Sequence, residues 1–118
     1  MAINFEKWLK HEFSSSGDTG EDFKQFTKEI KAWLKKDLAN KGLTFTLIRN
    51  HYRFSGFIFN PETKKYVYYN IPDVRFWPGE WYKTMLFRTA NSDTDYHGGF
   101  NQRCQIFELA DQALKLIA

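Results

Sequence analysis

Cysteine is almost missing from this sequence: Cys104 is the single one among 118 residues. One cysteine cannot form an internal disulfide, so nothing in the composition suggests a secreted, disulfide-stabilised domain. The chain also lacks an apolar run of the roughly 18 residues that a membrane span needs. Charged residues such as Glu6 and Lys7 interrupt the N-terminal segment, where a signal peptide would be apolar. We therefore expect a cytoplasmic protein with no membrane contact.

Standard catalytic and metal-binding signatures are missing as well. The sequence has no phosphate-cradling glycine loop, no GxSxG, no HExxH and no CxxC motif. Its histidines, His11, His51 and His97, are scattered and lack metal-ligand spacing. Cys104 falls at the start of an expected helix without a catalytic partner nearby, which favours a buried structural thiol. We expect no cofactor and no metal, and we favour a protein that is not an enzyme.

Aromatic residues are abundant, at 19% of the chain, with 12 Phe, 6 Tyr and 4 Trp. Each buried ring removes roughly 150–250 Å² from water, so a few rings can hold a small fold together. A chain of this length normally forms one undivided core. We expect a single domain over residues 1–118, with a ring-rich core and some rings left exposed for stacking or for a partner.

Positive charge is concentrated in the middle of the chain. Residues 41–90 carry eight Lys and Arg against three Asp and Glu, a net charge of +5. Residues 1–40 are neutral in sum, and residues 91–118 have a net charge of −2. The excess could attract phosphates or an acidic protein, although it is also ordinary for a soluble surface.

Hydrophobic periodicity predicts an α+β fold of two layers. Helical spacing indicates helices over residues 3–13, 21–39 and 103–117, the second with an apolar stripe from Phe23 to Leu38. Alternation of apolar and polar residues predicts four antiparallel strands in a meander, over 43–48, 52–59, 65–70 and 83–89. Gly56 marks a bulge or a close approach within the second strand.

A row of lysines follows the apolar stripe of the second helix at helical spacing: Lys24, Lys28, Lys31 and Lys35. Such a row is more often a solvated face than a binding groove. We therefore assign it no ligand from the sequence.

The loop over residues 91–102 combines Asp93, Asp95, His97, a glycine pair and Asn101. Histidine as acid or base, oriented by an aspartate, is what a small active site uses. A tight loop before a helix needs the same residues, because Asp and Asn satisfy backbone donors and glycine adopts positive φ. No Ser, Thr or Cys is placed in a pattern that would complete a triad with His97, which favours the structural interpretation.

Arginines lie within or beside the expected strands, interleaved with Tyr and Trp residues. These arginines are Arg49, Arg53, Arg75 and Arg88. The pattern suits single-strand nucleic-acid binders, which combine stacking rings with phosphate contacts. It equally suits a protein interface, where Trp, Tyr and Arg supply most of the binding energy. A third interpretation is that the arginines cover the sheet and pair with nearby acids such as Asp73.

Several short motifs between Phe54 and Asn101 resemble small uncharacterised proteins of phages and mobile elements of Firmicutes. The segments that carry the resemblance are Ser55-Gly56-Phe57, Asp73-Val74-Arg75, Phe87-Arg88-Thr89-Ala90 and Asp95-Tyr96-His97-Gly98-Gly99. No activity is attached to these proteins. The resemblance implies a context in which small single-domain proteins block host defence systems, as anti-CRISPR and anti-restriction proteins do.

These observations favour a non-enzymatic binding protein of phage or mobile-element type that inhibits a host defence complex by protein or ribonucleoprotein contact. We expect the exposed sheet face and the loop over 91–102 to bind the partner through Arg53, Arg75, Trp77, Trp81, Arg88, Tyr96 and His97. One alternative is a single-stranded nucleic-acid-binding domain. Another is a small enzyme that uses His97 with Asp93 or Asp95. The sequence leaves open the oligomeric state and which sheet face is exposed.

Overall fold

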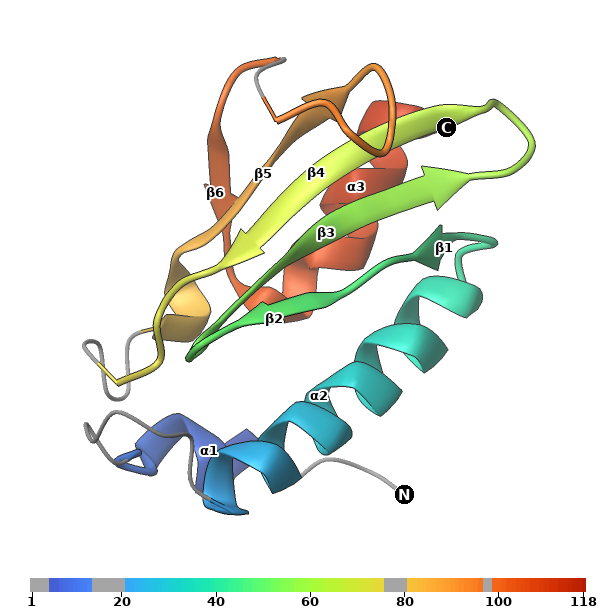
Figure 1. The fold of residues 1–118 in the computed structure, drawn as a ribbon. Helices are drawn as coiled ribbons and strands as arrows, with labels where there is room; N and C mark the ends of the chain where they lie inside the picture. The colour runs from blue at the N-terminus through green and yellow to red at the C-terminus, as the bar shows by residue number, and fades with distance from the viewer. Residues whose placement is uncertain (1–4, 14–20, 76–80, 97–98) are drawn as a thin grey trace.

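The structure, a computed structural model, describes residues 5–13, 21–75, 81–96 and 99–118, with only the backbone at Phe5, Leu9 and Trp81. Helices lead into an antiparallel sheet, and a further helix ends the chain (Figure 1). The elements are α1 (Phe5–Lys10), α2 (Glu21–Ala39), β1 (Thr44–Phe45), β2 (Ile48–Asn50), β3 (Arg53–Asn60), β4 (Lys65–Ile71), η1 (Trp81–Lys83), β5 (Met85–Ala90), β6 (Gln102–Cys104), η2 (Ile106–Glu108) and α3 (Leu109–Ile117). The expected α+β class is confirmed. No described helix is both long and apolar enough to cross a membrane.

The sheet has six strands, so the predicted count of four is wrong. Its order is β1-β3-β4-β5-β6, and β2 pairs with β3 on the side where β1 also pairs. The segment predicted as one strand over 43–48 is therefore divided into two short pieces. The antiparallel meander itself is present, with a continuous register between β3 and β4 from Phe54↔Ile71 to Asn60↔Lys65.

Gly56 explains why this edge of the sheet is divided. A Cβ atom built at Gly56 would lie 2.0 Å from the carbonyl oxygen of Thr46, which is far closer than atoms can pack. That oxygen accepts a hydrogen bond of 2.8 Å from the hydroxyl of Tyr69, the residue paired with Gly56 across the sheet. Burial raises the pKa of Tyr69 well above its ordinary value, so the hydroxyl stays a donor. The predicted close approach at Gly56 is confirmed.

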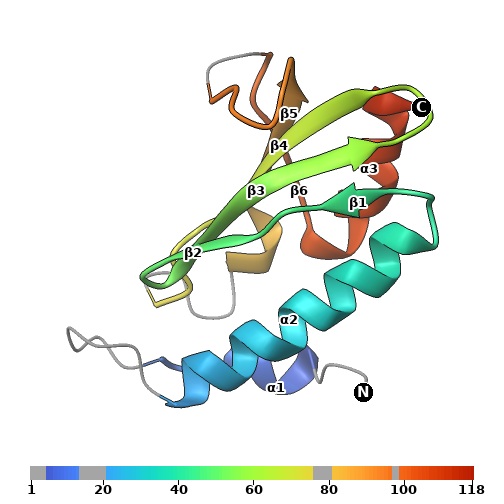
Figure 2. The ribbon, with the colours of Figure 1, turned by 45° about the vertical axis from the view of Figure 1, so that its right-hand side comes forward.

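The described helices pack on one face of the sheet and leave the other without a helix (Figures 1 and 2). Alternate residues of β3, β4 and β5 point into the core with α2 and α3, among them Ile58, Val67 and Phe87. The apolar stripe predicted for α2 supplies its buried side, formed by Phe23, Phe26, Ile30, Leu34 and Leu38.

The core is densest in rings where α1 and α2 meet the β2–β3 turn. Phe23 contacts four other rings there, those of Phe13, Phe26, Tyr52 and Phe54, with centroids 4.6–5.9 Å apart. Ring pairs at these separations add about 0.5–1.5 kcal/mol each beyond the area that they bury. The core therefore depends on this cluster at its N-terminal end.

The final segment differs from the continuous helix predicted over 103–117. Residues 102–104 instead form β6 on the free edge of β5, and η2 precedes α3. Apolar spacing alone does not show where a helix begins, because a short strand pairing depends on the distant β5. The carbonyl oxygen of Ile117 at the end of α3 accepts hydrogen bonds from Asn60 (2.8 Å) and Thr63 (2.6 Å), which fasten α3 to the β3–β4 turn.

Candidate functional site

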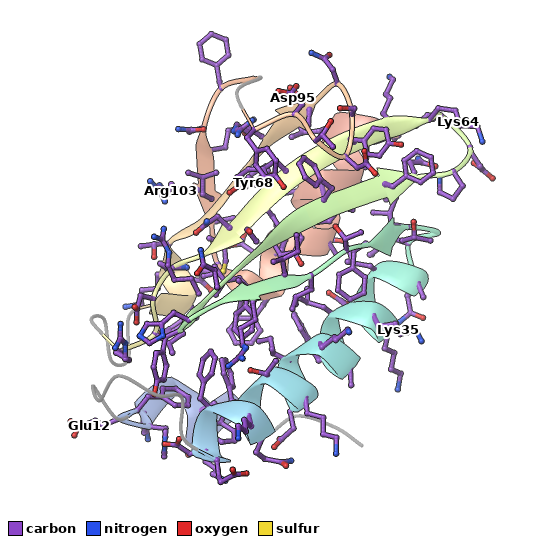
Figure 3. All side chains as sticks on the ribbon, viewed as in Figure 1. Glu12, Lys35, Lys64, Tyr68, Asp95 and Arg103 are labelled. Atoms are coloured by element: carbon purple, nitrogen blue, oxygen red, sulfur yellow. The ribbon has the colours of Figure 1, made fainter. Side chains whose placement is uncertain are left out.

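The uncovered side of the sheet carries a continuous set of rings beside one arginine. We call it the open face and define it by Phe57, Phe59, Tyr66, Tyr68, Leu86 and Arg88, which alternate with the core residues of β3, β4 and β5. Tyr68 pairs with Phe57 on one side and with Arg88 on the other. Figure 3 shows Tyr68 on this face and Asp95 on the loop that folds toward it.

The loop after β5 covers the middle of the open face. The ring of Tyr96 packs edge-on against Phe57 at 5.3 Å and against Tyr68 at 5.8 Å, measured between ring centroids. Phe57 is consequently only 3% exposed although it lies on the side without helices. The phenylalanine thus forms a second, small aromatic core between the sheet and the loop.

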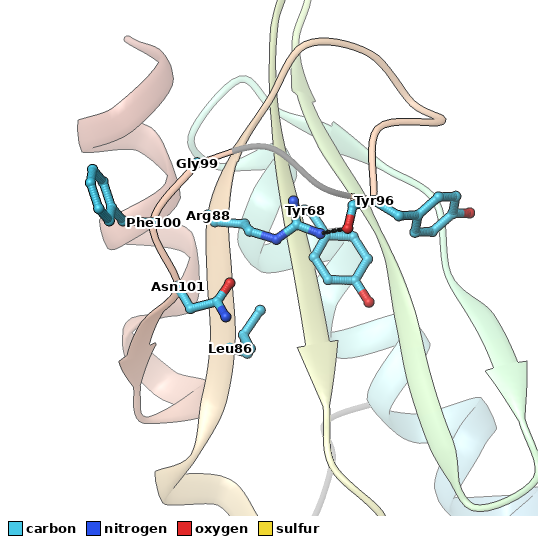
Figure 4. A pocket seen from close by; sticks show the side chains of 7 residues that line it. All are labelled: Tyr68, Leu86, Arg88, Tyr96, Gly99, Phe100 and Asn101. Carbon is cyan, nitrogen blue, oxygen red and sulfur yellow. Dashed lines mark hydrogen bonds between the residues drawn. The ribbon is translucent and has the colours of Figure 1, made fainter.

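Arg88 fixes this arrangement. Its guanidinium lies 4.4 Å from the ring centroid of Tyr68 and donates a hydrogen bond to the backbone carbonyl oxygen of Tyr96 (Figure 4). The residue is 6% exposed, so both contacts act in a partly desolvated site, where cation–π and charge-assisted bonds are strongest. Arg88 therefore connects the loop to the sheet.

Two further contacts shape the loop. The carboxylate of Asp95 accepts a hydrogen bond of 2.8 Å from the backbone N–H of Asn91. Gly99 has a φ of +73°, and a Cβ atom there would lie 2.7 Å from the carbonyl oxygen of Thr89. A residue with a side chain would be excluded from this position by both backbone conformation and contact. The first contact therefore fixes the start of the loop, and the second places Gly99 against β5.

Beside this loop lies a hollow of about 530 Å³, lined by Tyr68, Leu86, Arg88, Tyr96, Gly99, Phe100 and Asn101. Phe100 stands at its rim with 90% of its surface exposed, and Tyr96 is 49% exposed. Figure 4 shows the Phe100 ring projecting away from Arg88 and the sheet. The apolar surface of a phenylalanine this exposed is removed from water only when another molecule covers it.

Two of the predicted binding arginines lie at the opposite end of β3. Arg53 is exposed at the first position of that strand. Arg75 is enclosed: its guanidinium lies 4.3 Å from the Tyr52 ring centroid and forms an ion pair of 2.7 Å with Asp73. Burial by itself would raise the pKa of Asp73, but the hydrogen bonds from Arg75 outweigh it and hold this pKa below its ordinary value.

The structure thus brings together Arg88 and Tyr96 among the predicted site residues, and places Arg53 and Arg75 elsewhere. Arg53 lies four positions along β3 from Phe57, whose partner Tyr68 pairs with Arg88, and four positions correspond to about 13 Å along the strand. Trp77 and His97 lie outside the described residues. Trp81 begins η1, and its side chain also lies outside them.

The described residues proposed for a small active site, Asp93 and Asp95, make contacts typical of a structural role. Asp95 is engaged by the backbone of its own loop, and Asp93 lines a separate hollow with Phe57, Phe59 and Tyr66. Burial first, and the charge of Glu108 second, raise the pKa of Cys104 to about 11, so its thiol stays protonated near neutral pH. Cys104 lies in β6, not at a helix start as predicted. Within the described ranges, no three His, Cys, Asp or Glu residues are grouped to bind a metal.

Sequence reasoning named Arg88 and Tyr96 but did not single out Phe57 and Phe59. The signal is present in β3, where Phe57 and Phe59 alternate with the core residues Gly56 and Ile58. A strand with large apolar residues on both faces requires a cover on both. Phe100 has no such signal, since its exposure is decided by the path of the loop.

An Arg88→Met protein should release the loop while it keeps the length of the side-chain stem. We expect the free energy of unfolding to fall by about 1–2 kcal/mol, because the cation–π contact and the charge-assisted bond are both lost. We also expect chymotrypsin to cleave after Tyr96 faster than in the wild type. Arg53→Met removes an exposed arginine and should change neither quantity. Equal cleavage of wild-type and Arg88→Met proteins would show that Arg88 does not hold the loop.

No family model, no curated protein and no solved structure matches the chain. The residues of the open face and its loop are therefore the basis on which a function is proposed.

Proposed function

We propose that this protein is a non-enzymatic binding protein that docks a protein partner on its open face and the adjoining loop. The observation that supports this most directly is the exposed ring of Phe100 beside Tyr96, which is about half exposed and is bound by the buried Arg88. Tyr, Phe and Arg are enriched at the centres of protein interfaces, where ring burial supplies most of the binding energy.

The described part of the loop over residues 91–96 is organised before a partner arrives. Tyr96 is packed on two rings, Asp95 accepts a backbone hydrogen bond, and Arg88 donates to the loop carbonyl. A surface that is already ordered loses less conformational entropy on binding than a loop that must first become ordered. This pre-organisation favours a docking function for the loop.

Single-stranded nucleic acid is the competing ligand, because rings on adjacent strands are also a stacking platform. Phosphates would need cations on the same face. The Arg88 guanidinium is already engaged by Tyr68 and Tyr96, and Arg103 donates to the carbonyl oxygen of Thr84. The carboxylate of Asp93 adds negative charge beside Phe59 and Tyr66. These features favour a protein partner.

Within this proposal, the partner class is a host defence complex, as the resemblance to proteins of phages and mobile elements suggests. Contact with a protein subunit of such a complex would suffice for inhibition. The proposal of a docking surface does not depend on that biological context, since it rests on the residues of the open face.

The test compares Phe100→Ala and Tyr66→Ser proteins with the wild type. The wild-type protein is used to capture partners from cells of the native host, and these partners are identified. The affinity of the purified partner is then measured for the wild type and for each variant. An aromatic residue at the centre of an interface typically contributes 2 kcal/mol or more, so we expect each variant to weaken binding by about 30-fold. Both side chains lie at the surface, and circular dichroism should show both variants folded.

Phe107→Ala is the matched control, because Phe107 is an exposed phenylalanine on η2, outside the open face. It should leave the affinity unchanged. A Phe100→Ala protein that binds the partner as tightly as the wild type would contradict the proposal. Salt-sensitive binding of an unstructured oligonucleotide, abolished by Tyr66→Ser, would instead favour the nucleic-acid alternative.

A further inference from the structure

A groove runs between α2 and the divided edge of the sheet, away from the open face. It has a volume of about 410 Å³ and is lined by Lys31, Lys35, Ala39, Leu43, Thr44, Phe45, Thr46 and Leu47. Leu43 is buried, and Phe45 and Leu47 are partly buried, so the floor is apolar. Lysines stand on the helix side, and the strand side carries neutral threonines.

The strand side of the groove is an edge of the sheet. Among the described strands, β1 and β2 pair with β3 alone, and no strand lies on their outer side. The backbone of such an edge can accept one more strand, because half of its N–H and C=O groups point away from the sheet. Addition of an extended peptide to an edge beside a helix is a recurrent mode of peptide recognition.

The helix side of the groove carries uncompensated positive charge. Lys28, Lys31 and Lys35 recur at helical spacing, which aligns them on one side of α2 over about 10 Å. All three are exposed, and none forms an ion pair with the residues that the structure describes. Lys24, the first lysine of the row, differs in being bound to Glu21 at 3.1 Å.

The two sides lie close to one another. Lys31 and Lys35 line the same groove as Thr44 and Thr46, and Lys31 also lines a second hollow that continues along residues 21–31 of α2. Figure 3 shows Lys35 projecting from the part of α2 that is nearest β1. A strand placed on the edge would therefore have lysine ammonium groups along its flank.

We propose that the β1–β2 edge and the Lys28–Lys31–Lys35 row bind an acidic segment of a protein partner in extended conformation. The segment adds a strand to the edge and packs apolar side chains on Leu43, Phe45 and Leu47. Its carboxylates lie against the lysines. Backbone hydrogen bonds supply affinity that does not depend on sequence, and the lysines select for acidic over basic segments.

The probe for this site is a fluorescent peptide of about ten residues in which Glu and Val alternate, long enough to span the edge from 44 to 50. Fluorescence anisotropy should show saturable binding that weakens as salt is raised. A Lys31→Glu/Lys35→Glu protein should bind about tenfold more weakly. Hydrogen exchange at the amides of residues 44–50 should slow in the wild type when the peptide is added.

Two controls separate the parts of the proposal. A Lys36→Glu/Lys65→Glu protein has the same change in charge at exposed lysines that do not line the groove, and it should bind like the wild type. A peptide methylated at every backbone nitrogen keeps its charge but cannot donate hydrogen bonds to the edge from either side, and its binding should be lost.

The proposal is overturned by any of four results. The wild type does not bind the acidic peptide, or it binds a Lys-Val peptide equally well. The control double variant loses as much affinity as Lys31→Glu/Lys35→Glu. Hydrogen exchange at the amides of residues 44–50 slows without peptide as the protein concentration is raised. That result would show that a second copy of the chain occupies the edge.

Discussion

A Gly56→Ala protein is expected to lose about 3–4 kcal/mol of its free energy of unfolding. The added methyl group would overlap the carbonyl oxygen of Thr46, which lies 2.0 Å from the Cβ position. Relief requires that the edge segment between β1 and β2 move away. That movement breaks the bond from the Tyr69 hydroxyl and leaves a buried donor without a partner.

A loss of this size is a large part of the 5–15 kcal/mol that stabilises a typical domain. The melting temperature of a chain of this length should fall by roughly 10–20 °C. Urea unfolding followed by circular dichroism measures the free energy, and calorimetry measures the midpoint. Because the same movement would displace Thr44 and Thr46, the variant should also bind the acidic peptide less tightly.

Gly42→Ala provides the matched control for Gly56→Ala. Gly42 has a φ of +74°, and a Cβ atom there would meet nothing within 4 Å. The only cost is the left-handed backbone conformation, about 1–2 kcal/mol. If the two alanine variants are destabilised equally, contact with Thr46 is not what requires glycine at position 56.

A Phe23→Ala protein should lose about 3–5 kcal/mol, because it removes a fully buried ring and leaves a cavity. Phe23 lies among four other rings, those of Phe13, Phe26, Tyr52 and Phe54. These rings come from the segment after α1, from α2 itself, from the β2–β3 turn and from β3, so they cannot close the gap without displacing the helix. Denaturant unfolding measures the loss, and binding of a hydrophobic dye would report an opened core.

The same substitution at Phe100 should change the stability by less than about 0.5 kcal/mol, since that ring is 90% exposed. Phe100→Ala is also the variant expected to lose partner binding. The pair therefore separates the two uses of phenylalanine in this chain. Comparable destabilisation at both positions would mean that Phe100 is packed in solution, and the docking proposal would lose its main support.

Local patterns in the sequence were sufficient for the elements with strong periodicity. The stripe of α2 predicted its buried side, because each of its residues returns to the same side of the helix every three or four positions. The meander of β3, β4 and β5 followed from the alternation of apolar and polar residues. The prediction was wrong at β6 and at the division between β1 and β2. These strands are only two or three residues long. Segments this short have no period of their own.

The candidate site was only partly accessible from the sequence. Composition placed arginines and rings on the sheet, but it could not distinguish Arg75, which is bound to Asp73 and Tyr52, from the exposed Arg53. That difference depends on which segment folds back over the β2–β3 turn. The row of lysines on α2 was visible from spacing, whereas the groove beside it required β1 to lie next to the helix.

The sequence by itself determined the α+β class, the buried side of α2, the close approach at Gly56 and the absence of standard catalytic motifs. Each of these depends on residue type and on spacing over a few positions. Only the tertiary structure decided that Tyr96 covers Phe57 and is bound by Arg88, that Phe100 is left exposed and that a lysine-lined groove follows the β1–β2 edge. These features are contacts between distant segments, and their geometry is fixed by the packing of the whole sheet against its helices.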